Sequence, residues 1–184
     1  MSDLGIPGKM VRLHHALFAA GLPHAFGGAL ALAWCVGEVR ATMDIDLNLF
    51  VGLDRIDAAL EALPDGVTWE PADERTLHRD GQARLRWGRH PVDVFLNTTS
   101  FHEEAARRVR WEPFAGTDLP FLDCNDLAVF KAFLARPKDW VDLEEMARTG
   151  SVDIAATVGN LIPYLGAHDE RIARLERLER LTSS

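Results

Sequence analysis

The stretch GGALALAWCVGEVRATMDIDL, residues 27–47, decides how this chain of 184 residues folds. Its last part continues into DIDLNLFV, residues 44–51, where apolar and polar residues alternate strictly. Alternation with a period of two is typical of a strand that has one buried face. The pattern therefore predicts a half-buried strand whose polar face carries Asp44 and Asp46.

A second alternating segment, VDVFL at 92–96, carries Asp93 on its polar face. If the two strands are neighbours, three carboxylates converge: Asp44, Asp46 and Asp93. Unscreened carboxylates repel one another unless a cation lies between them, and hard oxygen ligands suit Mg²⁺ or Mn²⁺. Three carboxylates that hold two ions about 4 Å apart are the arrangement used for in-line phosphoryl or nucleotidyl transfer.

The Gly27-Gly28 turn follows a short strand expected over 24–26 and opens a helix expected over 29–36. Backbone N–H groups at such a turn can bind phosphate oxygens, and glycine allows the phosphate to come close. Arg40 and Thr42 precede the acidic strand and add a guanidinium and a hydroxyl. The order of these features along the chain, more than any one of them, indicates a nucleotide site.

The rest of the pattern predicts an α/β half over 1–122 and an all-helical segment over 123–184 that packs on it, with no flexible linker between them. Further helices are expected over 8–20, 54–63, from about 101 with Thr98 or Ser100 as cap, 126–134, 137–148, 152–165 and 168–182. Further strands are expected over 67–70, 83–87, 109–114 and 119–122. The Ala-rich and Leu-rich helix over 29–36 is expected to be buried.

Composition excludes several classes. The hydrophobic share of 47% and the net charge of −8 fit a globular chain and disfavour whole-protein attraction to nucleic acid. No apolar run could span a bilayer, and no signal peptide is visible at the N-terminus. Cys35 and Cys124 lie far apart in the sequence, which argues against a disulfide scaffold and a zinc site and fits a reducing cytoplasm.

Two local basic clusters remain, and each is either a solvated face or a surface for a polyanion. They are Arg84, Arg86, Arg89 and His90, and Arg107, Arg108 and Arg110. His90 is expected at the surface. The apolar spacing over 172–181 predicts packing on the core, with a short seam for a dimer as the alternative, so both a monomer and a dimer stay open.

The chain resembles the minimal nucleotidyltransferases of the DNA polymerase beta superfamily, and among them the AbiEii/MenT-like group. The resemblance rests on the motif residues above and on DLAVFKAFLARPKDWVDLEEM, residues 126–146. It implies a mixed sheet with helices on it, two Mg²⁺ ions on the three aspartates, and an NTP as donor. It also implies that Lys131 reaches the triphosphate and that Lys138, Asp139 and Asp142 line the same cleft. At Gly28 the chain departs from the Gly-Ser pair that many members carry.

These features predict transfer of an NMP from an NTP to an acceptor hydroxyl. The acceptor is RNA or a protein if the enzyme is toxin-like, in which case an antitoxin partner is expected. Alternatively, it is a small hydroxylated molecule, as in the aminoglycoside-modifying relatives. The residues are also compatible with an inactive nucleotide-binding module, or with a metal-dependent phosphoesterase built on the same carboxylates.

Overall fold

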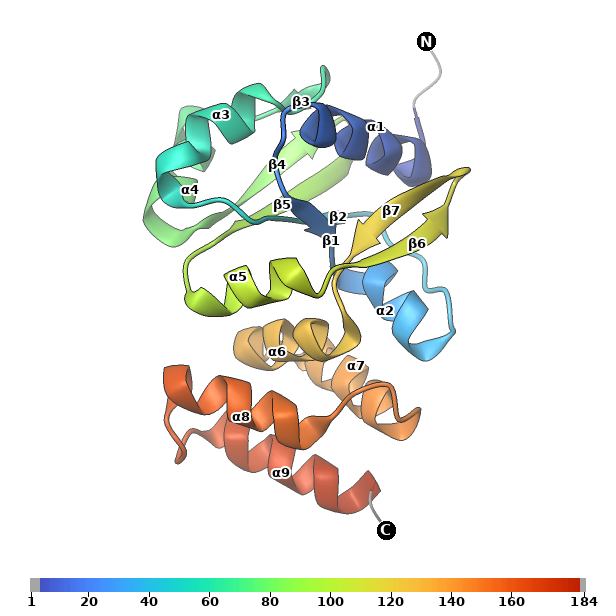
Figure 1. Ribbon diagram of the computed structural model, residues 1–184, viewed down its shortest axis with the longest axis vertical. Helices are drawn as coiled ribbons and strands as arrows, with labels where there is room; N and C mark the ends of the chain where they lie inside the picture. Colours follow the sequence, from blue (N-terminus) through green and yellow to red (C-terminus); the bar gives the residue numbers. More distant parts are fainter. Residues whose placement is uncertain (1–3, 183–184) are drawn as a thin grey trace. The chain divides into compact units, whose positions relative to one another are not determined.

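The computed structural model describes residues 4–182 (Figure 1). They divide into two compact units: the first comprises 4–28 and 41–122, and the second comprises 29–40 and 123–182. Residues 29–40 therefore group with the helices that follow residue 122. A functional division into a core over 1–122 and a subdomain over 123–184 stays a prediction.

The first unit is built on one mixed sheet, with strand order β3-β4-β5-β2-β1-β7-β6 (Figure 1). The strands are β1 (His24–Phe26), β2 (Ile45–Leu49), β3 (Val67–Thr68), β4 (Gln82–Trp87), β5 (His90–Leu96), β6 (Arg110–Phe114) and β7 (Thr117–Phe121). β1 pairs with β7 and β2 pairs with β5 in parallel, while the other neighbours are antiparallel. The predicted mixed α/β fold is thereby confirmed.

The centre of this sheet follows the alternation seen in the sequence. β2 and β5 pair in register, so that their apolar residues share one face and are almost fully buried: Ile45, Leu47, Leu49, Val92, Val94 and Leu96. Asp46 and Asp93 are direct partners on the opposite face and are only partly buried. The condition that the two acidic strands are neighbours is therefore met.

The helices of the first unit are α1 (Ile6–Ala19), the 3-10 turn η1 (Leu53–Arg55), α3 (Ile56–Glu61), α4 (Pro71–Asp80) and α5 (Ser100–Arg107). Sequence periodicity did not predict α4, because Leu77 is its only buried residue. Its signals are at its ends, where Pro71 opens the helix and Gly81 follows it with φ of 68°. The expected cap of α5 was wrong: Thr99 is the N-cap residue, and its hydroxyl lies 2.9 Å from Nδ1 of His102.

The second unit is helical. It contains α2 (Gly28–Val36, of which Gly28 belongs to the first unit), α6 (Cys124–Leu134), α7 (Pro137–Arg148), α8 (Ile154–Leu165) and α9 (Glu170–Thr182). α6 contacts α7, α8 and α9, and α9 also contacts α7 and α8. Ile172 and Leu175 of α9 are buried in this unit, whereas Leu181 is 74% exposed. The expectation that α2 is buried was met in part: Ala31 and Leu32 are buried, Trp34 is 39% exposed, and the other residues of the helix are half-buried.

The prediction that the two cysteines form no disulfide was wrong. Cys35 on α2 and Cys124 at the start of α6 form a disulfide, with a sequence separation of 89 and Cα atoms 5.7 Å apart. The sequence did not indicate this pairing, because the two thiols are brought together by the packing of two helices that lie far apart in the chain. Within residues 4–182, none of the helices has the length and apolar character needed to cross a membrane.

Candidate active site

Three aspartates gather around the start of β2 and β5 in the first unit. Asp46 and Asp93 are in-register partners on neighbouring parallel strands, and Asp44 immediately precedes β2. The Thr42 hydroxyl donates a hydrogen bond to Oδ1 of Asp44 at 2.7 Å. Thr42 thereby fixes the orientation of the Asp44 carboxylate. The sequence pattern had predicted a different role for Thr42, a contact with the nucleotide.

The Gly27-Gly28 turn lies directly against Asp46. The Gly27 N–H donates to the backbone carbonyl of Asp46 at 2.9 Å, so this N–H extends the hydrogen-bond ladder between β1 and β2. Gly28 has φ of +58°, and a Cβ built on it would overlap the Asp46 carboxylate. Glycine at 28 is therefore required by conformation and by space, which explains the departure from the Gly-Ser pair.

Arg84 on β4 is the residue of this site whose role the sequence did not reveal. It is the cross-strand partner of Asp93, and its Nε and one Nη donate to the two carboxylate oxygens of Asp93, each at 2.7 Å. The same Nη lies 3.6 Å from Oδ2 of Asp44. These hydrogen bonds, and then the charges of Asp93, Asp44 and Asp46, raise the pKa of the Arg84 guanidinium. The alternation of β4 could have placed Arg84 on the acidic face, but strand order was needed to pair it with Asp93.

The donor set of this site fits a hard divalent cation. All three carboxylates act on the single cationic group of Arg84, so they create one region of negative potential. Carboxylate oxygens are the ligands that Mg²⁺ and Mn²⁺ prefer. With Arg84 bound to Asp93, however, the carboxylates are held by a guanidinium. Among the described residues, three possible metal ligands whose ligand atoms all lie within 4.8 Å of one another are found at a different place, at Asp57, Glu74 and His78.

That second group lies on α3 and α4 of the first unit. His78 Nε2 is 4.0 Å from Oδ1 of Asp57, and the Asp57 side chain is 81% exposed. No motif of the sequence pointed to it, and exposed acidic groups of this kind are common on protein surfaces.

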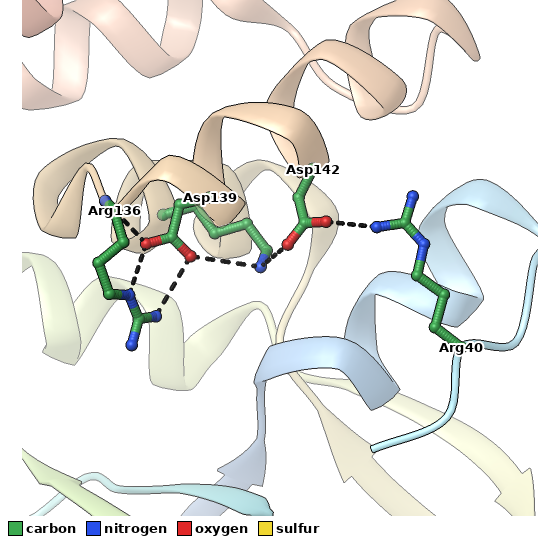
Figure 2. A network of polar contacts seen from close by, with 5 residues as sticks. Arg40, Arg136, Asp139 and Asp142 are labelled. Atoms are coloured by element: carbon green, nitrogen blue, oxygen red, sulfur yellow. Dashed lines mark hydrogen bonds and ion pairs between the residues drawn. The ribbon is translucent and has the colours of Figure 1, made fainter.

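A buried ion-pair network lies in the second unit (Figure 2). Asp142 on α7 accepts a hydrogen bond from Arg40 at 2.6 Å and one from Lys131 of α6 at 2.7 Å. Asp139, whose side chain is fully buried, accepts from the Arg136 side chain at 2.7 Å and lies 3.8 Å from Lys131 Nζ. Buried carboxylates require such partners, because an unpaired charge away from water is costly.

The structure thus places the predicted nucleotide-binding residues in two groups. Gly27, Gly28 and Thr42 lie in the first unit with the aspartates, whereas Arg40, Lys131, Lys138 and Asp139 lie in the second. The charges of Lys131 and Arg40 are bound by Asp142. Lys138 is exposed and forms no ion pair with any residue from 4 to 182.

Members of both basic clusters are paired with acids inside the first unit. Arg86 lies 3.5 Å from Asp73, and the second cluster pairs with Glu104 and Glu112. The expectation that His90 lies at the surface was wrong. Its side chain is buried, and its Nδ1 lies 2.9 Å from the Lys9 ammonium.

A buried pair of imidazoles joins α1 to β1. His24 Nδ1 donates to the carbonyl of Leu22 at 2.8 Å, which leaves its Nε2 as acceptor for Nδ1–H of His14 at 3.0 Å. Burial lowers the pKa of His24 to about 4 and lowers that of His14 as well. Both rings are therefore neutral in the folded protein near neutral pH.

Comparison with known proteins agrees with the fold. No protein-family model matches this chain, and no curated protein matches its sequence. Among solved structures, the chain is similar to the antibiotic-resistance factor ANT(2'')-Ia in solution, with 19% identity, a TM-score of 0.53, and 96% of this chain and 92% of that chain covered. It is also similar to the crystal structure of ANT(2'')-Ia in complex with adenylyl-2''-tobramycin, with 17% identity, a TM-score of 0.51, and coverage of 97% and 98%.

A third similar structure is that of an antigenic nucleotidyltransferase-like protein from Paracoccidioides brasiliensis. It has 13% identity and a TM-score of 0.52, and 91% of each chain is covered. At these identities the likeness establishes the fold alone. This chain therefore has a fold that is also found in nucleotidyltransferases.

Proposed function

We propose that this protein transfers an NMP from an NTP to an acceptor hydroxyl. The observation that carries the proposal is the in-register pairing of Asp46 with Asp93, beside Asp44 and against the backbone of Gly28. Two carboxylates on adjacent parallel strands and a third just before one of them can share a cation, and phosphoryl chemistry needs such a cation to neutralise phosphate charge.

Asp44, Asp46 and Asp93 would hold one or two Mg²⁺ or Mn²⁺ ions, which supply neutralisation of the triphosphate charge when bound. The protein's own residues then have distinct tasks. Thr42 keeps Asp44 oriented, Gly28 leaves Asp46 room against the backbone, and Asp93 accepts the proton of the attacking hydroxyl once Arg84 releases it. Catalysis is otherwise a matter of positioning the hydroxyl in line with the leaving pyrophosphate.

For the remaining nucleotide contacts we keep the assignment from the sequence as a proposal: Gly27, Arg40, Lys131, Lys138 and Asp139. Because Asp142 accepts hydrogen bonds from both Arg40 and Lys131, we propose that the main role of Asp142 is to position these two cations. A direct contact of either with phosphate requires that Asp142 yields a hydrogen bond.

A small hydroxylated acceptor is the candidate that a specific observation favours. One structure with this fold was solved with adenylyl-2''-tobramycin, an adenylylated small molecule. In addition, Arg107, Arg108 and Arg110, which would have attracted RNA, are paired with glutamates. Modification of RNA or protein by an AbiEii/MenT-like toxin, with an antitoxin partner and a cytoplasmic location, is the second proposal and rests on the sequence resemblance.

The test is a label-transfer assay. Purified protein is mixed with each α-labelled NTP, Mg²⁺ or Mn²⁺, and in turn an aminoglycoside panel, total RNA and a protein extract. We expect label in one acceptor class with the wild type and none with Asp44→Asn. The matched control Asp57→Asn, which removes a carboxylate from the α3–α4 group, should transfer normally. An active Asp44→Asn enzyme would rule out the mechanism, and label with no acceptor class would favour an inactive module.

A further inference from the structure

A cavity of about 460 Å³ lies in the second unit, and neither the sequence pattern nor the proposed reaction uses it. Apolar residues from the end of α6 and the start of α7 form one part of its wall: Ala135, Pro137 and Trp140. Charged residues of α9 form the other part: Glu170, Arg171, Arg174 and Arg177. Its volume falls in the range of about 300–1,000 Å³ that is usual for small-ligand sites.

Three arginines line this cavity at spacings of three residues along α9. Because successive residues of a helix are rotated by about 100°, positions i, i+3 and i+6 stay within an arc of about 120°. The guanidinium groups of Arg171, Arg174 and Arg177 therefore leave the helix on one side. Glu170 is the one acid among the lining residues, in a chain whose net charge is −8.

Two of the arginines are held in place by the protein. Arg171 donates to both carboxylate oxygens of Asp169 at 2.8 Å and to the carbonyl of Phe133 at 2.8 Å. The carbon at the centre of the Arg174 guanidinium lies 4.2 Å from the centroid of the Trp140 ring. Stacking on an indole fixes the plane of a guanidinium and leaves its N–H edge available to a ligand.

Arg177 is different, because it forms no hydrogen bond or ion pair with any residue of the described part of the chain. Arg174 has only a distant ion pair, 3.6 Å from a carboxylate oxygen of Glu144. Within residues 4–182, the cavity thus presents one guanidinium, that of Arg177, without a partner. It presents a second, pre-oriented guanidinium, that of Arg174, whose hydrogen-bonding capacity is mostly unused. Arg171 adds positive charge that Asp169 largely compensates.

We propose that this cavity binds the phosphate group of a small phosphate ester, about the size of a mononucleotide. A carboxylate has two oxygens and is satisfied by one guanidinium, whereas a terminal phosphate has three and can engage Arg174 and Arg177 together. The apolar wall formed by Pro137 and Trp140 gives the organic part of the ester a surface to pack on. This site goes beyond the proposed transfer reaction, since it shares no residue with the three aspartates.

The test is titration with AMP, ribose 5-phosphate and inorganic phosphate by calorimetry, in EDTA so that no divalent cation supports binding elsewhere. The side-chain Nε–H signals of the arginines, followed by NMR, report which guanidinium groups respond. We expect both esters to bind more tightly than inorganic phosphate, and adenosine, which has no phosphate, not to bind. Arg177→Gln should weaken the esters by about 10- to 100-fold, the usual effect of losing a hydrogen bond to a charged group.

Arg75→Gln is the matched control, because Arg75 lies on α4 in the other unit and forms no ion pair with any described residue, so its loss should leave the affinity unchanged. Ester binding should also survive Asp44→Asn, which separates this site from the transfer site. Equal affinity in wild type and Arg177→Gln would overturn the proposal. So would binding of adenosine as tight as that of AMP, or the absence of ester binding at millimolar concentration.

Discussion

Replacing Arg84 with glutamine should tighten binding of a divalent cation to the protein without nucleotide. Arg84 forms two hydrogen bonds to Asp93, and its guanidinium also lies 3.6 Å from Asp44. A cation that uses Asp93 must first displace this guanidinium. The protein therefore contains its own competitor for the carboxylates, and removal of that competitor lowers the free energy needed to bind a metal ion.

The size of the effect follows from the exposure of the pair. The Asp93 side chain is 15% exposed, which favours a strong bidentate interaction, but that of Arg84 is 60% exposed and is screened by water. A buried charged hydrogen bond contributes about 1.5–3 kcal/mol and an exposed ion pair about 0–1 kcal/mol, so an intermediate value of about 1–2 kcal/mol applies here. The dissociation constant for Mn²⁺ should therefore fall by about 5- to 30-fold.

The assay is titration of the nucleotide-free protein with Mn²⁺, read by the loss of the free-ion EPR signal and by calorimetry with Mg²⁺. Arg86→Gln is the matched control: Arg86 lies on the same strand, its side chain is also 60% exposed, and it pairs with Asp73. It reports the effect of losing one positive charge near the site. If Arg84→Gln binds Mn²⁺ no more tightly than Arg86→Gln, the guanidinium does not compete for the metal ligands.

Three further predictions concern stability. Burial keeps His24 neutral in the folded protein, while the same side chain takes up a proton below about pH 6.5 in the unfolded chain. The free energy of unfolding should therefore fall by up to ~3 kcal/mol between pH 6.5 and 4. Denaturant titrations at several pH values should show this fall, and His24→Gln should flatten the profile. Reduction of the Cys35–Cys124 disulfide, which has a sequence separation of 89, should lower that free energy by about 4–5 kcal/mol; an unchanged melting temperature in dithiothreitol would refute this. Gly28→Ser should cost at least ~1–2 kcal/mol because of its φ of +58° and should abolish transfer by displacing Asp46, whereas retained activity would contradict the close packing of Gly28 against that carboxylate.

Sequence patterns predicted the parts of the fold in which each strand has one buried face. The alternation in β2 and β5 was sufficient to place Asp46 and Asp93 on the polar face, and strand pairing then brought them into register. The same reasoning failed for α4, since a helix with one buried residue has no apolar stripe to detect. Its capping signals at Pro71 and Gly81 could have revealed it.

The remaining errors concern contacts between residues that are distant in the chain. The ammonium of Lys9 on α1 contacts the buried ring of His90, and no local pattern indicates that a lysine will be buried there. The pairing of Cys35 with Cys124 likewise depends on how α2 and α6 pack. Arg84 was recognised as basic, but its role depends on strand order, which periodicity alone does not give.

The way the chain is shared between the two units has a consequence for its synthesis. Residues 29–40 leave the ribosome early, yet the helices with which they group follow residue 122. During translation, α2 cannot pack against its partners until the α6–α9 segment has been synthesised. The whole sheet can form before that, because its last strand, β7, ends at Phe121. A nascent chain stalled before α6 would thus present the Leu-rich and Ala-rich α2 without its partners, and exposed apolar surface of this kind favours aggregation of an incomplete chain.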